Sequence, residues 1–418
     1  MALDPTALSA QTEPTARPGT PLGRFGVTMP LAAFGLNLAL LTPVVVTLAL
    51  KVEDVSPATK ERDLGIILGI GAFLALVSNP LAGRLSDRTA SRFGMRRPWL
   101  LGGSVLGALG LAVIALADGV LLIGVGWCVT QVAYNGALAA LSATLPDQVR
   151  SERRGAVSGL VGITTLLSVV AGSLLAAVFG GDVGRFLVPA AIALVLVGVF
   201  VVVLRDRMAS GTPARLDLRG FLGSFVFDPR RYPDFGWAWL TRFTFVFAAA
   251  TGLTYLPYFL SDELGIPTDE VPGRVAVATV AAAGATVLAS VLGGFLSDRI
   301  GRRKPFVVVA ALVAMVGLIV VALSGSFTQL VIGEVILGVG TGCFYAVDLA
   351  LITEVLPSAD DVAKDLGVIN MANALPQSLA PAIAPVFLAI GGYPLLFIAG
   401  AVVGIIGALL VTRIRSVA

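Results

Sequence analysis

Two carboxylates lie on one face of a long apolar stretch late in the chain. Glu334, Gly338, Thr341, Tyr345 and Asp348 follow at steps of four, three, four and three residues, as on one helix face, which places the carboxylates about 21 Å apart. A charge at the bilayer centre costs at least about 2.5–3.5 kcal/mol, so it faces protein or a wet cavity. Asp348 is therefore the first candidate for proton binding or cation pairing, and Glu334 the second. Alternatively, Asp348 pairs permanently with an arginine and only locks helices together.

A second set of polar residues in apolar stretches could bind a neutral solute. Amides and hydroxyls hydrogen-bond the edges of a sugar or polyol, and aromatic rings stack on its apolar face. The same amides could instead join helices, and Arg242 could extend to the membrane interface. The candidates for the substrate pathway are Asn37, Gln131, Tyr134, Asn135, Arg242, Tyr255, Tyr345, Asn370, Asn373 and Gln377.

The stretches that carry these candidates are long enough to span a membrane. Hydrophobic residues make up 56% of the 418-residue chain and charged residues only 13%, whereas soluble domains carry about a quarter charged residues. Apolar runs of about 20 residues cross the bilayer as helices, and they lack the alternation of a β-barrel. We expect an all-α membrane protein with twelve transmembrane helices in two pseudo-symmetric six-helix halves. The predicted spans are 28–50, 64–83, 99–117, 119–145, 155–180, 185–204, 236–260, 274–296, 305–324, 327–355, 365–390 and 393–412.

Basic residues set the expected topology. Of the 29 Lys and Arg, the loops of one side hold only Lys51, Lys60, Arg62, Arg185 and Arg274. Positive loops stay in the cytoplasm, so we expect a multi-pass plasma or inner membrane protein with both termini cytoplasmic. The predicted divisions are a disordered cytoplasmic N-terminal tail at 1–21, six-helix halves at 22–204 and 235–418, and a cytoplasmic linker at 205–234.

A charged hinge between two spans occurs twice. Gly83, Ser86, Asp87 and Arg88 recur 211 residues later, while "GMRRPW" and "GRRKPF" align at 207 because the first hinge has four extra residues. Tyr134 and Pro146 also match Tyr345 and Pro357 at 211. Positive-inside pressure alone would explain the arginines but not the aspartates and glycines. The repeat therefore predicts two homologous halves, an arrangement common in transporters with a midplane substrate site.

The hinges have the chemistry of a switch. Asp87 can accept hydrogen bonds from the N-terminus of a facing helix and pair with a nearby arginine. Such contacts form when the cytoplasmic ends of the halves meet and break when they part. The predicted latch consists of Gly83, Asp87, Arg88, Arg92, Arg96, Arg97, Asp298, Arg299, Arg302 and Arg303.

The hinge pattern G-x-L-S-D-R-x-G-R-R resembles the signature of the major facilitator superfamily, in which it acts as a cytoplasmic conformational latch. The stretches at 34–48, 85–98 and 131–159 are similar to plant-type sucrose/proton symporters, a branch of the glycoside–pentoside–hexuronide cation symporters. This closer resemblance covers roughly the first 160 residues. It implies sugar transport by rocker-switch alternating access.

The chain departs from that branch at the coupling site. Gln131 stands where the sugar family has a carboxylate, Ser142 where it has an arginine, and span 2 lacks the acidic residues with which melibiose-type relatives hold sodium. Gln131 cannot titrate, so the family's proton site does not carry over. Asp348 is then the best remaining coupling position; otherwise the protein is a uniporter.

The expected function is therefore proton-coupled secondary transport of a sugar or related small polar solute. The alternatives are an exporter of drugs or metabolites with the same fold, and a non-transporting membrane receptor or assembly factor. The sequence has no nucleotide loop, no metal-spaced His/Cys set and no nucleophile elbow, so we expect no enzyme, no metal and no cofactor. The expected partners are the solute, a coupling proton and the lipid bilayer, with no nucleic acid, and the chain is expected to be a monomer.

Overall fold

The computed structural model describes residues 22–206, 227–355 and 362–415. The predicted tail at 1–21 and most of the predicted linker at 205–234 lie outside these residues. Within them the chain is helical and contains no strand, as predicted. The elements of the first part are α1 (Leu22–Thr42), η2 (Pro43–Thr47), α2 (Leu48–Val55), η3 (Pro57–Thr59), α3 (Lys60–Asp87), α4 (Arg97–Ala115), α5 (Val120–Gln148), α6 (Ser151–Val178) and α7 (Gly181–Val203). Those of the second part are α9 (Pro233–Tyr258), η4 (Phe259–Glu263), α10 (Val271–Ile300), α11 (Arg303–Ala322), α12 (Phe327–Glu354), α13 (Val362–Leu410) and η5 (Val411–Arg413).

The described helices account for the twelve predicted spans. Eleven continuous helical segments are long and apolar enough to cross a membrane. The last of them includes most of α13, which bends at Gly391 and Gly392, where Gly392 has φ 66°. Only glycine adopts this conformation at little cost. Because the bend divides α13 at the predicted boundary between two spans, the segment supplies both of them.

Two spans contain a short π-helical segment. In the first span, η2 begins at Pro43 and connects α1 to α2 without a break. Proline has no N–H for the helical hydrogen bond, which favours a local change of helix type. In the seventh span, η4 follows Pro257 and extends α9 to Glu263. Both π segments lie toward the same end of the molecule.

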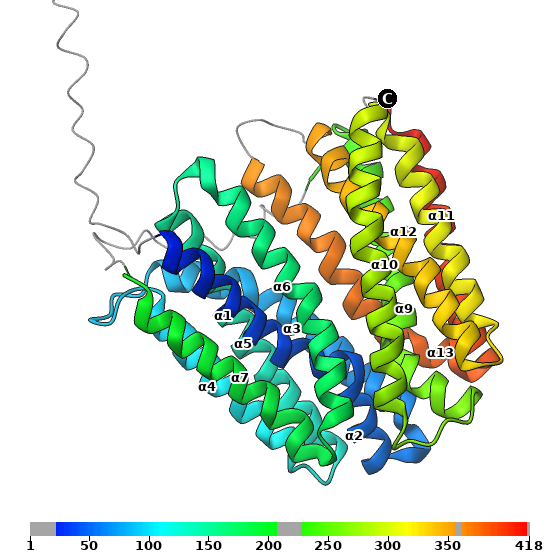
Figure 1. Cartoon of the computed structure of the whole chain (residues 1–418), viewed down its shortest axis with the longest axis horizontal. Coiled ribbons are helices and arrows are strands. Elements are labelled where there is room, and N and C mark those ends of the chain that lie inside the picture. The colour runs from blue at the N-terminus through cyan, green and yellow to red at the C-terminus, as the bar shows by residue number, and fades with distance from the viewer. Residues whose placement is uncertain (1–21, 207–226, 356–361, 416–418) are drawn as a thin grey trace, which may run out of the picture.

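The helices form two groups that meet along two pairs of spans (Figure 1). Among the first six spans, α4 packs against α5, and α1 against α6 and α7. Among the last six, α12 packs against α10 and α11, and α9 against α13. The groups meet where α3 contacts α13 and where α6 contacts α10.

Close glycine contacts fix the register of the repeat. In the first group, Gly110 of α4 faces Gly126 of α5, and in the second Gly317 of α11 faces Gly333 of α12 in the same way. Both members of the second pair lie 207 residues after those of the first. The match of Tyr134 with Tyr345 at 211 is therefore wrong by about one helical turn. The four extra residues of the first hinge shift everything after it to 207; Pro357 lies outside the described residues.

Candidate functional site

A cavity of about 910 Å³ lies between the two groups of spans. Its wall combines apolar side chains with six amides, from Asn79, Gln131, Asn135, Asn370, Asn373 and Gln377. The other lining residues are Leu40, Leu41, Val44, Leu68, Ala72, Ala75, Leu76, Pro80, Arg84, Val246, Ala249, Ala250, Leu253, Thr254, Tyr345, Met371, Ala374 and Pro381. Both groups contribute, so movement of one against the other would change the access to this cavity.

On the side of the first six spans, Gln131 and Asn135 of α5 form an amide pair. The Asn135 side-chain amide donates to Gln131 Oε1 at 2.9 Å and to the Gln131 backbone oxygen at 2.8 Å. Gly71 of α3 lets α5 approach, because a Cβ there would lie 2.2 Å from Trp127 Nε1 and 3.2 Å from Gln131 Cγ. The pair is thereby positioned at the cavity wall by close packing of α3 on α5.

On the side of the last six spans, a buried ion pair lies directly behind the wall. Arg242 Nη1 of α9 bonds Asp348 Oδ2 of α12 at 2.5 Å, and their side chains are 11% and 1% exposed. Arg242 Nε donates to Asn373 Oδ1 of α13 at 2.7 Å, and its guanidinium lies 5.8 Å from the centre of the Tyr345 ring. Asn373 and Tyr345 both line the cavity. Arg242 therefore points inward rather than to the membrane interface, and Asp348 is paired in this conformation.

Two predicted pathway residues and one predicted coupling residue lie away from the cavity wall. Asn37 donates to Thr165 of α6 at 3.3 Å and does not line the cavity. Tyr134 is fully buried against Gly107 of α4 and does not line the cavity. Glu334 is partly buried and has no hydrogen bond or ion pair to the residues that the structure describes.

The lining residues that were not predicted include Asn79, Arg84, Thr254 and Met371. Asn79 is a polar residue within an apolar run and precedes a proline, so its type was a usable signal. Arg84 is the second residue of the hinge motif and was grouped with the loop arginines. Thr254 and Met371 resemble ordinary helix-packing residues, and nothing in the sequence distinguishes them.

One end of the molecule is closed by polar contacts between the two groups; we call it the sealed end (residues 48–63, 255–263 and 393). Lys60 Nζ of α3 bonds Asp262 Oδ1 of η4 at 2.7 Å and Glu53 Oε1 of α2 at 2.6 Å. Tyr393 of α13 donates to Asp262 Oδ2 at 2.6 Å and to Glu61 Oε1 at 3.2 Å. Further tyrosine hydroxyls reach across from α9: Tyr258 to the oxygen of Ala49 at 2.8 Å and Tyr255 to that of Glu61 at 3.2 Å.

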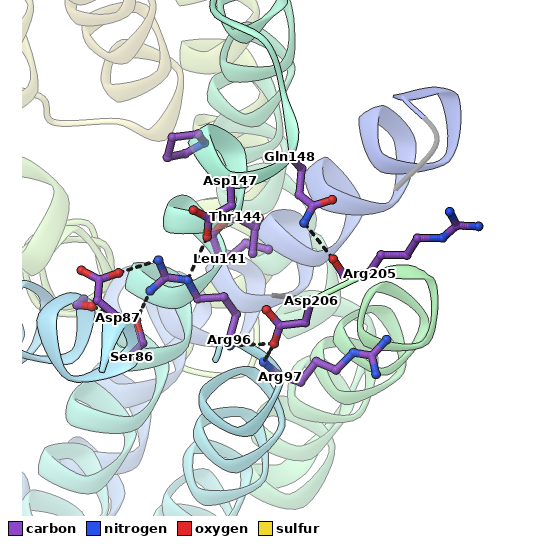
Figure 2. A network of polar contacts seen from close by, with 12 residues as sticks. Ser86, Asp87, Arg96, Arg97, Leu141, Thr144, Asp147, Gln148, Arg205 and Asp206 are labelled. Atoms are coloured by element: carbon purple, nitrogen blue, oxygen red, sulfur yellow. Dashed lines mark hydrogen bonds and ion pairs between the residues drawn. The ribbon is translucent and has the colours of Figure 1, made fainter. Parts of the chain in front are cut away.

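The first hinge lies at the opposite end and forms a compact polar network (Figure 2). Arg96, 5% exposed, bonds Asp87 Oδ1 at 2.5 Å, Asp147 Oδ2 at 3.1 Å and Ser86 Oγ at 2.5 Å. Asp206, just after α7, accepts from the backbone N–H groups of Arg96 and Arg97 at 2.7 and 2.9 Å. Asp206 therefore caps the N-terminus of α4, where a negative charge is stabilising. All of these contacts lie within the first six spans.

The second hinge repeats only part of this network. Arg303 Nη1 bonds Glu354 Oε1 at 2.8 Å, with side chains 27% and 42% exposed. This pair lies 207 residues after Arg96 and Asp147. Gly94 and Gly301 are also 207 apart and have φ values of 105° and 70°.

The remaining predicted latch residues lie around these two hinges. Gly83 has open space around it, Arg88 closes α3, and Arg92 lies 4.9 Å from the Phe93 ring centre. Arg97 donates to the backbone oxygen of Leu204. Asp298, Arg299 and Arg302 are exposed, as is Arg92.

Comparison with known proteins agrees with this architecture. The family model described as "Major Facilitator Superfamily" matches residues 26–287 and 272–417. The chain is 43% identical over 68 residues to an arabinose-proton symporter of Bacillus subtilis, covering 16% of this chain and 14% of that protein. It is 49% identical over 45 residues to an uncharacterised symporter of Synechocystis, covering 11% of this chain and 8% of that protein. These matches span a small part of each relative.

Solved structures are similar over nearly the whole chain. A mutant of the nucleoside transporter NupG superimposes with a TM-score of 0.74 at 14% identity, covering 93% of this chain and 99% of that one. A bacterial homologue of the human lysosomal transporter Spinster gives 0.71 at 16% identity, covering 95% and 97%. At such identity the likeness concerns the fold. Together with the family match, it identifies the chain as a member of the Major Facilitator Superfamily, and so as a membrane transporter rather than an enzyme.

Proposed function

We propose that this transporter moves a sugar or related small polar solute together with a proton, by alternating access of the cavity to the two sides of the membrane. The observation that carries the proposal is a cavity lined with amides from both groups of spans, with the Arg242–Asp348 pair directly behind its wall. Its volume lies within the range of small-molecule sites. The match to an arabinose-proton symporter and the resemblance to sucrose/proton symporters support the solute class.

Coupling is assigned first to Asp348. In the structure its charge is balanced by Arg242 at 2.5 Å. A proton on Asp348 would remove this balance and release the guanidinium, so protonation and the arrangement of the cavity wall are linked through one ion pair. Glu334 is the second candidate. A carboxylate in an apolar span is energetically costly, and a residue kept at such a cost is a functional candidate.

The orientation follows from the loops. The end that carries the two basic hinges is cytoplasmic, with both termini, in the plasma or inner membrane. The sealed end then faces the outside, so the structure has its outer gate closed. The hinge residues form the inner latch in the opposite state, when the cytoplasmic ends of the two groups meet. Each chain contains a complete cavity, so we expect a monomer to transport.

Solute-driven proton movement in proteoliposomes tests the proposal. Purified protein is reconstituted with an internal pH dye, and a panel of sugars, sugar acids, polyols and nucleosides is added. We expect at least one solute to drive proton movement, and Asp348→Asn to transport by exchange without protons. Glu354→Gln, which alters an exposed pair outside the cavity, serves as the matched control.

Each contrary outcome has a defined meaning. Coupled proton movement in Asp348→Asn, lost instead in Glu334→Gln, would move the coupling site to Glu334. Solute flux without protons in the unmodified protein would make it a uniporter. An exporter of amphiphilic compounds is favoured by the many apolar lining residues; broad drug resistance of an overexpressing strain would support it. A folded protein without any flux would indicate a receptor or assembly factor.

A further inference from the structure

We propose that the transported solute is an anion of the sugar-acid type, and that Arg242 binds its carboxylate in exchange for Asp348. This inference rests on the transport function proposed above and narrows its substrate class. It depends on three features of the cavity: the charge of its wall, the unused donors of Arg242 and the balance of charge around Asp348.

The wall of the cavity suits an anion better than a neutral sugar. No aspartate or glutamate is among the described lining residues, and Arg84 is the one charged side chain in that set. A neutral sugar would find no carboxylate acceptors for its hydroxyl groups. Tyr345 is the single aromatic residue of the described lining, and its ring already lies next to the Arg242 guanidinium. The amides remain available to hydrogen-bond the hydroxyl groups of a sugar acid.

Arg242, which lies next to the cavity wall, has donors to spare. Its Nε and Nη1 are occupied by Asn373 and Asp348. Within the described part of the chain, Nη2 has no hydrogen-bond partner. A guanidinium presents donors in a planar fork that binds a carboxylate through two parallel bonds. Asn373 and Tyr345, which contact Arg242, also line the cavity, so a small shift of these two side chains would expose the fork to the solute.

Charge balance links the solute to the proton. Arg242 on α9 is the charged group that acts on Asp348, and Tyr345, one turn earlier on α12, lies near both. In the described residues, α10 and α11, which also pack on α12, contribute no charged group there. With Asp348 ionised the pair is neutral. When Asp348 takes up a proton, the guanidinium keeps its charge and needs a new anion. One proton and one monoanion then cross together, and no net charge moves.

This prediction separates a sugar acid from a neutral sugar by the response to voltage. Symport of one proton with a neutral sugar moves one charge, so 100 mV of membrane potential drives about 50-fold accumulation. Symport of one proton with one monoanion gives no accumulation from voltage alone. D-glucuronate, D-galacturonate and D-gluconate are compared with D-glucose and D-galactose in proteoliposomes, under either a potassium–valinomycin potential or a pH gradient.

We expect at least one of the acids to accumulate when a pH gradient is applied and not when only a membrane potential is applied. The neutral sugars should not accumulate under either condition. Arg242→Lys keeps the charge but loses the fork, so we expect weaker binding of the acid by at least tenfold, measured by thermal shift. Asp348→Asn is expected to bind the acid equally at pH 5.5 and pH 7.5, whereas the unmodified protein prefers pH 5.5. Arg274→Lys, in an exposed pair with Glu270, is the control and should leave binding unchanged.

The result that overturns the inference is voltage-driven uptake of a neutral sugar with no binding of the acids. The proposed transport function would survive that result. Acid uptake that follows the voltage would also overturn the inference, because the proton would then not compensate the solute charge. If no solute of the panel binds or moves while the protein stays folded, both proposals fail. If Asp348→Asn does not fold, acid binding by Arg242→Lys is measured at both pH values in its place. Binding as tight as in the unmodified protein would then overturn the inference.

Discussion

Replacing Lys60 with methionine tests the gate at the sealed end. The ammonium of Lys60 bonds two carboxylates that contribute differently to opening. Glu53 belongs to the same six spans as Lys60, so their 2.6 Å pair persists in both states. Asp262 belongs to the other six spans, so its 2.7 Å pair with Lys60 exists only while this end is closed. Only the second pair therefore changes the equilibrium between the closed and open sealed end.

The expected change in the opening free energy follows from the exposure of the Lys60–Asp262 pair. A hydrogen bond to a charged group contributes about 1.5–3 kcal/mol. Asp262 is 34% exposed, and solvent weakens the interaction. We therefore expect Lys60→Met to favour the open sealed end by about 1–2 kcal/mol, which increases a minor open population by about 5–30-fold.

A cysteine at Leu68 reports this opening, because Leu68 lines the cavity and is 5% exposed. In a background without Cys128 and Cys343, a membrane-impermeant maleimide is added from the sealed-end side. The labelling rate of Leu68→Cys should rise about 5–30-fold when Lys60→Met is added. Lys51→Met is the matched control, since Lys51 bonds Asp182 at the same 2.7 Å but within the first six spans. Equal rates with and without Lys60→Met, or the same rise with Lys51→Met, would refute the assignment of this gate.

Three further substitutions test the packing and the hinges by thermal stability in detergent. Gly317→Ala should destabilise the protein by about 1–3 kcal/mol, because a Cβ there would meet backbone atoms of Leu337 at 2.3 Å and Gly333 at 2.8 Å. Gly325→Ala is the control: a Cβ there meets nothing within 4 Å, so the substitution should be neutral. Asp206→Ala should cost about 1–2 kcal/mol through the lost α4 cap and speed hydrogen exchange in its first turn. Arg96→Gln should cost about 3–5 kcal/mol, against about 0–1 kcal/mol for Arg303→Gln, and equal losses would contradict the difference in burial.

Hydropathy was sufficient to predict the spans, because a bilayer requires long apolar helices. The offset between the two halves beyond the first hinge was harder to predict. Two residue matches at 211 agreed with the part of the hinge that precedes the four inserted residues, and only the glycine contacts revealed the shift to 207. Tyr134 was assigned to the substrate pathway as a polar residue of the same apolar stretch as Gln131 and Asn135, although it packs against α4 in the structure.

The cavity could be predicted in part. Asparagine and glutamine in apolar spans are costly, so Gln131, Asn135, Asn370 and Gln377 were recognisable, and they line the cavity. Contacts between distant parts of the chain were not recognisable. Asp348 and Arg242 are 106 positions apart, and Lys60 and Asp262 are 202 apart. Which partner each charge meets is decided by how the helices pack, and residue type alone does not contain this information.

The unequal burial of the two hinges has a consequence for ionic strength. Mobile ions weaken an attraction between exposed charges far more than one between buried charges. The Arg303–Glu354 contact is open to solvent, whereas Arg96 is enclosed by its three partners. Raising the salt concentration should therefore loosen the second hinge and leave the first intact. The hinges of the two groups of spans would then differ in stiffness, and ionic strength would tune only the second of them.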